Sequence, residues 1–89
     1  MNNQEKHVIL GVHVTDRIQH VGRVQEVLSQ FGCYIKTRIG LHEASKNFCS
    51  PNGVILLEML DDQSKIDEMT TMLNQIEGVE VQHMTFGHP

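Results

Sequence analysis

Histidine and cysteine are the residues of this chain best suited to chemistry, and there are six histidines and two cysteines among its 89 residues. Imidazole nitrogen and thiolate sulfur suit nickel, zinc, copper and iron, whereas magnesium and calcium prefer oxygen. No C-x-x-C, H-x-H or H-E-x-x-H spacing occurs, so no single element carries a complete metal site. His42 and Cys49 flank a polar stretch and would converge if it folds back. They are the predicted metal ligands; the alternative is that both are ordinary loop residues.

A second candidate site consists of His13 and Glu58, each of which interrupts an apolar segment near its C-terminal end. If these segments are parallel neighbours in a sheet, the two side chains meet on one face. They would then form a ligand-binding pair, or a metal ligand with a supporting carboxylate. The alternative is a structural polar pair in a subunit interface, because buried polar groups need partners. His83 is expected near them, from the last strand.

Enzymatic chemistry has little support in the sequence. There is no G-x-S-x-G motif, no glycine-rich phosphate loop and no Cys/His/Asn signature of a cysteine hydrolase. The five methionines stand at helix and strand positions, where they serve as core filler. The prediction is therefore that the chain is not an enzyme and has no catalytic residues.

Charge and hydropathy exclude several partners. The net charge is −4, from seven Lys and Arg against eleven Asp and Glu. Nucleic-acid binders carry basic patches, whereas here the cations are interleaved with acids, so direct nucleic-acid binding is not expected. No stretch approaches the 18 or more apolar residues of a membrane span, and the N-terminal run lacks a signal-peptide cleavage pattern. Two cysteines do not make a disulfide framework, so a cytoplasmic location is expected.

The elements that must position these residues follow from hydrophobic periodicity. Alternating or continuous apolar runs predict four strands, at residues 7–14, 33–41, 54–60 and 79–86. Lys36 and Arg38 on one side of the second strand are typical of a sheet edge. Two amphipathic patterns predict helices, the first from the N-cap Asp16 to Gly32 and the second from the N-cap Ser64 to Gly78. Residues 42–53 are predicted to form a polar loop.

Gly22 interrupts the first predicted helix, where glycine costs about 1 kcal/mol relative to alanine. Close packing of a neighbouring element is the expected reason for it.

The two halves of the chain repeat one pattern, an amphipathic helix followed by glycine and a strand. The element order β-α-β-β-α-β describes an α+β, ferredoxin-like sandwich, in which two helices cover one face of a four-stranded antiparallel sheet. Right-handed crossovers place the first and third strands in its centre. The whole chain, 1–89, is expected to be a single domain with an ordered core at about residues 6–86.

These residues resemble known regulatory domains. The segment TDRIQHVGRVQEVLSQFGCYI is similar to the first unit of ACT domains, with Asp16 and Arg17 at the turn between strand and helix. With IKTRIGLHE and GVILLEML, the chain resembles more closely the iron-only hydrogenase system regulators, over residues 6–86. The resemblance implies a stand-alone regulatory protein, similar in fold to ACT domains and to the metal-sensing half of nickel-responsive repressors.

The functional prediction is a non-catalytic regulatory module that binds a small effector or a metal ion at a subunit interface. Its cofactor is unknown; nickel, zinc or iron would suit the donors. The alternatives are a protein-interaction scaffold that binds another regulatory protein or an enzyme, and a small enzyme. Helices on one face leave the other face of the sheet open, and Ile9, Val54 and Leu56 would be uncovered there. A homo-oligomer, dimer or tetramer, is therefore expected.

Overall fold

The computed structural model describes residues 6–15, 17–44 and 49–87. These ranges contain four strands, two α-helices and one short 3-10 helix. In chain order they are β1 (His7–Val14), α1 (Arg17–Gln30), η1 (Gly32–Tyr34), β2 (Ile35–Ala44), β3 (Cys49–Met59), α2 (Gln63–Asn74) and β4 (Val79–Phe86).

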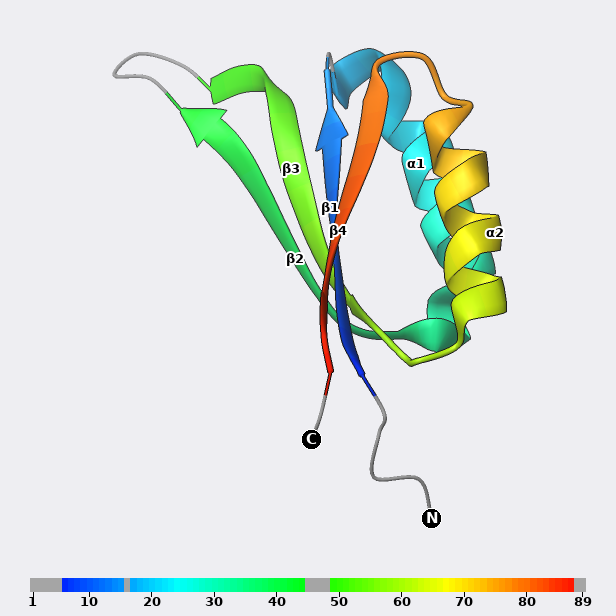
Figure 1. Ribbon diagram of the computed structural model, residues 1–89. Helices are drawn as coiled ribbons and strands as arrows, with labels where there is room; N and C mark the ends of the chain where they lie inside the picture. Colours follow the sequence, from blue (N-terminus) through cyan, green and yellow to red (C-terminus); the bar gives the residue numbers. More distant parts are fainter. Residues whose placement is uncertain (1–5, 16, 45–48, 88–89) are drawn as a thin grey trace.

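The four strands form one antiparallel sheet in the order β2-β3-β1-β4, which confirms the predicted ferredoxin-like arrangement. Both helices lie on the same side of this sheet, and the other side carries no element of the described chain (Figure 1). We call these sides the helix face and the open face. As the charged positions predict, β2 is an edge strand.

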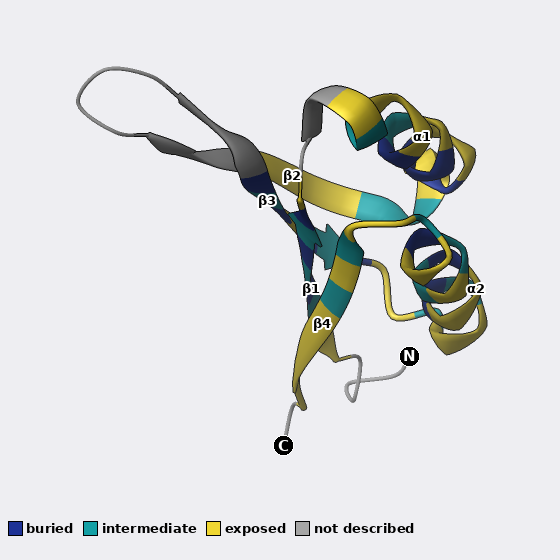
Figure 2. Ribbon diagram, turned by 90° about the horizontal axis from the view of Figure 1, so that it is seen from above, coloured by how far each residue is buried: buried dark blue, intermediate teal, exposed yellow. Residues whose placement is uncertain are grey.

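The core lies between the helices and the sheet, because alternate residues of the central strands point toward the helices. Val8, Leu10, Val12 and Val14 of β1 are buried, as are alternate residues of β3. In Figure 2 the buried positions of both helices are turned toward the sheet. Among the described residues no polar or charged side chain is buried, so this core consists of aliphatic, methionine and phenylalanine side chains.

The second helix begins two residues earlier than its sequence pattern predicts. Asp62 is the N-cap in place of Ser64, and its side chain accepts a hydrogen bond from the backbone N–H of Lys65 at 3.2 Å. A carboxylate satisfies a free N–H group of the first helical turn and also interacts favourably with the helix dipole.

The predicted loop over residues 42–53 is largely strand. β2 continues to Ala44 and β3 begins at Cys49, so that the two strands form a long hairpin. β1 pairs with β3 only from Gly53 onward, and the hairpin therefore extends beyond the rest of the sheet (Figure 1). Residues 45–48 of the predicted loop lie outside the described residues.

Candidate functional site

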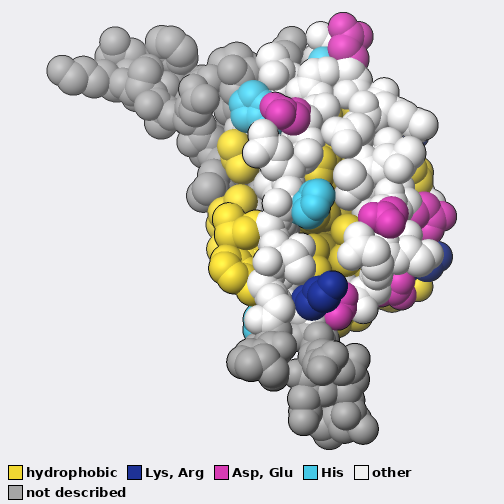
Figure 3. Space-filling view, viewed as in Figure 1, with side chains coloured by type: hydrophobic (Ala, Val, Ile, Leu, Met, Phe, Trp, Pro, Cys, Tyr) yellow, Lys and Arg dark blue, Asp and Glu magenta, His cyan; other side chains and the backbone are white. Residues whose placement is uncertain are grey.

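The open face of the sheet is the surface on which apolar and polar side chains meet. Strand register assigns to this face the residues of β1 and β3 that alternate with the core positions, together with their neighbours on β2 and β4. Its large hydrophobic residues are exposed: Ile39 by 51%, Leu56 by 36%, Met84 by 55% and Phe86 by 51%. In Figure 3 hydrophobic side chains gather on the left of the molecule, the side away from the helices.

These hydrophobic residues are not scattered across the open face. Met84 of β4 pairs with Ile9 of β1. Two residues further along β1, at the level of Gly11, Leu56 of β3 pairs with Ile39 of β2. Phe86 follows Met84 by two residues, toward the end of β4. They form a diagonal from the corner at the end of β4 to the middle of β2, which we call the apolar band (Ile9, Ile39, Leu56, Met84 and Phe86). The predicted exposure of Ile9, Val54 and Leu56 on an uncovered face is confirmed, with Ile9 and Val54 partly exposed.

The prediction that His13 and Glu58 meet is wrong. β1 and β3 are antiparallel, so Ile9 is the partner of Glu58, and His13 pairs with Val54. Four residues of extended strand separate the two positions, about 13 Å. The prediction assumed parallel strands. Because one helical crossover makes β1 and β2 parallel, β3, inserted between them, must run antiparallel to both.

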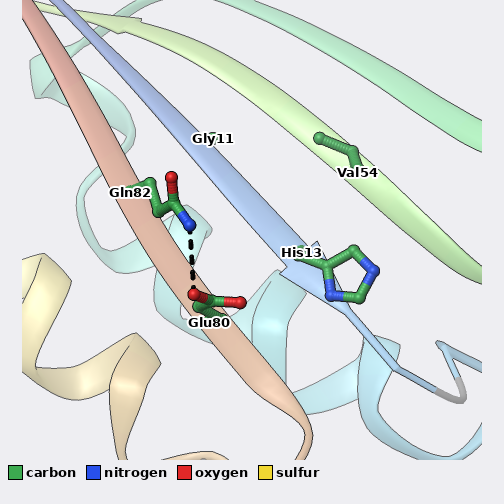
Figure 4. Close-up of a pocket in the computed structure, with 5 residues that line it drawn as sticks. All are labelled: Gly11, His13, Val54, Glu80 and Gln82. Carbon is green, nitrogen blue, oxygen red and sulfur yellow. Dashed lines mark hydrogen bonds between the residues drawn. The ribbon is translucent and has the colours of Figure 1, made fainter.

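His13 instead lies in a shallow hollow beside the last strand. Its cross-strand partner on β4 is Glu80, and the hollow of about 200 Å³ is lined by Gly11, His13, Val54, Glu80 and Gln82. The Gln82 amide donates a hydrogen bond of 3.1 Å to the Glu80 carboxylate, and the ring of His13 lies on the same side of the sheet (Figure 4). We call His13, Glu80 and Gln82 the histidine corner. An imidazole, an oriented carboxylate and an amide are able to bind a polar or cationic ligand.

Glu58 belongs to a different polar group at the opposite corner. Its Oε2 atom lies 3.2 Å from Nδ1 of His7 and 3.8 Å from Nζ of Lys36. We call His7, Lys36 and Glu58 the lysine corner. The register shift of β2 between Ile35 and Thr37 directs Lys36 to the open face, whereas Arg38 donates a hydrogen bond to Gln25 of α1 on the helix face. Lys36 and Arg38 therefore do not share a side, contrary to the prediction.

The backbone of His42 and Cys49 is paired within the long hairpin rather than in a loop. His42 lies opposite Gly53, and Cys49 lies opposite Ala44, so the two positions are close together at the end of the hairpin that passes beyond β1. His83 lies opposite Leu10, a residue of the helix face, and is thus not a neighbour of His13 on the open face.

Two limits on the site follow from the described part of the chain. Among the side chains described within residues 6–15, 17–44 and 49–87, which leave out those of residues 41–52, no three or more His, Cys, Asp or Glu residues are grouped closely enough to hold a metal ion. No helix in the same ranges is long and apolar enough to cross a membrane.

Glu80 and Gln82 are the functional candidates that sequence reasoning missed. In the segment VEVQHMTF they occupy the polar positions of an ordinary alternation, which by itself indicates only a solvated face. The signal was the register between the first and last strands, since it places Glu80 directly opposite His13.

The fold and its uncovered sheet face define a small α+β domain of the ACT type. The ACT domain of the GTP pyrophosphokinase of Chlorobium tepidum superposes with a TM-score of 0.61 at 17% identity, covering 92% of this chain and 100% of that one. A nitrogen regulatory PII-like protein of Thiomonas intermedia K12, bound to ADP, AMP and acetate, superposes with a TM-score of 0.60 at 9% identity, covering 99% and 93%.

The family itself is shown by residues 6–83. They match the family model "TM1266-like: Iron-only hydrogenase system regulator, putative", and the chain belongs to this family. The TM1266 protein of Thermotoga maritima superposes with a TM-score of 0.76 at 27% identity, covering 91% of this chain and 96% of that one. The predicted family is thereby confirmed. No curated protein matches the chain.

Proposed function

We propose that this chain is a non-catalytic regulatory module that associates with copies of itself through the open face and binds a small effector there. The observation that carries the proposal is the placement of an exposed apolar band beside the hollow of the histidine corner on one uncovered face. Exposed apolar side chains in a contiguous patch mark interaction surfaces. A polar hollow at the margin of such a surface is enclosed when the surface is covered, which favours ligand binding between subunits.

The family supports the regulatory part of this proposal. Its model describes a system regulator, and the solved structures of the same fold include an ACT domain and a nitrogen regulatory PII-like protein. Both of these neighbours are below 20% identity, and they therefore support the fold alone.

A thermal-shift screen of the purified, tag-free protein tests the proposal. The panel contains Ni²⁺, Zn²⁺ and Fe²⁺ salts, amino acids and adenine nucleotides. A ligand that binds only the folded form raises the melting temperature by mass action, and we expect one class in the panel to do so. A screen without any shift, together with a single species of 10.1 kDa in sedimentation, would contradict both parts of the proposal.

The first prediction concerns His13. In the His13→Ala variant we expect the rise in melting temperature induced by an amino acid or a nucleotide to disappear, while the melting temperature of the free protein stays within about 2 °C, because His13 is outside the core. His83→Ala is the matched control, since it removes the same ring from a position opposite Leu10. Equal ligand shifts in the two variants would exclude the histidine corner as the effector site.

The second prediction concerns His42 and Cys49, which we keep as the proposed metal ligands. Elemental analysis of tag-free protein is expected to find bound nickel, zinc or iron, and the His42→Ala, Cys49→Ala double variant is expected to lose it. The fold should persist, because the paired segment at His42 and Cys49 extends past the end of β1. Cys33→Ala, at the exposed cysteine of η1, is the control that must keep its metal. Unchanged metal content in the double variant would remove both residues from the site.

A further inference from the structure

Apolar and polar side chains are arranged on the open face so that the face is complementary to the open face of a second copy. The apolar band runs along one diagonal of the sheet, and the two polar corners lie on the other diagonal. The histidine corner contains Glu80 on edge strand β4, and the lysine corner contains Lys36 on edge strand β2. Among the described residues of the open face, the side chains that can carry a positive charge are Lys36 and the histidines. Lys36 lies diagonally opposite the carboxylate of Glu80.

A two-fold axis has a simple effect on such a surface. If the axis lies in the interface along the apolar band, rotation by half a turn places the band of one copy on the band of the other. The same rotation exchanges the two polar corners, so that the lysine corner of each copy covers the histidine corner of its partner. The strands of the two sheets then cross at about 90°, which is one of the two preferred angles for packing sheets face to face.

Gly11 gives an independent reason to expect close approach by another molecule. It lies near the middle of the open face, between Leu56 of β3 and Gln82 of β4. A Cβ atom at this position would meet its nearest described neighbours at 3.9 and 4.0 Å, which is ordinary contact, and the backbone does not have positive φ. Neither space nor conformation within the chain requires glycine here. A glycine inside a strand is typical of a place where a ligand or another backbone approaches closely.

We infer that two copies of the chain pack open face to open face with the symmetry axis along the apolar band, so that Lys36 of each copy lies against Glu80 of the other. This inference rests on the proposed function and specifies the orientation of its subunit interface. It also brings Glu58 of one copy close to His13 of the other. The small-ligand hollow at the histidine corner is then completed by the partner's Lys36 and Glu58.

Charge reversal tests the orientation. Lys36→Glu places two like charges together, and because symmetry repeats the contact, we expect the dissociation constant of the dimer to rise about tenfold. Glu80→Lys should weaken the dimer similarly. The double variant Lys36→Glu, Glu80→Lys should recover most of the affinity, since it restores opposite charges across the interface. Sedimentation at low ionic strength measures all four proteins, and at high salt the differences should diminish.

Zero-length carbodiimide cross-linking provides the second measurement. A mixture of unlabelled and ¹⁵N-labelled wild-type protein separates links between chains from links within one chain by mass. We expect an inter-chain peptide that joins Lys36 to Glu80. If the protein is dimeric but this link is missing and the double variant recovers no affinity, the orientation is overturned and the proposed function still stands. A protein that is monomeric at all concentrations would overturn both.

Discussion

Replacing Leu56 by aspartate is expected to abolish self-association of the chain while leaving its fold intact. Leu56 lies in the apolar band near the centre of the open face, and it remains 36% exposed in the single chain. An aspartate there is solvated in the monomer, but an interface would have to bury it without a partner. We expect the dissociation constant to rise at least about 100-fold, equivalent to about 2.7 kcal/mol.

Two measurements separate loss of assembly from loss of folding. Light scattering at micromolar concentration should give the monomer mass, and chemical denaturation at a concentration where the wild type is also monomeric should give a free energy of unfolding within about 0.5 kcal/mol of the wild type. Thr71→Asp, on the exposed surface of α2, is the control and must leave assembly unchanged. If Leu56→Asp remains oligomeric, the open face is not the interface.

Two glycine-to-alanine substitutions are expected to change stability in opposite directions. Gly78 precedes β4 and has a φ angle of +81°, a conformation that L side chains rarely adopt. An added Cβ would lie 3.1 Å from the carbonyl oxygen of Thr15 and 3.2 Å from the ring of His20. The carbonyl of Gly78 also accepts the N–H of Thr15 at 2.8 Å, so this backbone has little freedom to move away. Gly78→Ala should lower the free energy of unfolding by about 2 kcal/mol.

Gly22 is the matched control for this prediction. It lies inside α1, and a Cβ there would meet no described atom within 4 Å. Alanine at this position should raise the free energy of unfolding by about 1 kcal/mol, because it reduces the conformational entropy of the unfolded chain and favours the helix. Denaturant titration of both variants measures the difference. Destabilisation by Gly22→Ala, or neutrality of Gly78→Ala, would contradict the assignment.

The sequence predicted the elements that build the core better than it predicted the site. The predicted bounds of the strands at residues 7–14 and 79–86 agree with those in the structure. In β1 buried core residues alternate with residues of the open face, and a glycine directly precedes β4. Serine, proline, asparagine and glycine within residues 49–53 are typical of turns and predict a loop there. In the structure they belong to β3, and β1 pairs with β3 only from Gly53 onward.

The candidate site depends on register, which no single residue encodes. A histidine in an apolar strand is conspicuous in the sequence, but the carboxylate opposite His13 is Glu80 on β4, and its partner on β3 is Val54. Gly22 shows a similar limit: the expected packing against a neighbour is missing among the described atoms. Glycine in a helix indicates close contact only when the opposing element is known.

The position of β1 in the sheet has a consequence for the order in which the protein can fold. β1 is synthesised before both of its neighbours in the sheet, although it is a central strand: β3 begins at Cys49, and β4 begins at Val79. Loop closure over such sequence distances slows folding, because the entropy is lost before the long-range contacts form. Until Phe86 has emerged, the sheet lacks an edge strand and β1 presents an unpaired edge. The nascent chain is therefore most prone to incorrect pairing just before synthesis of its last strand is complete.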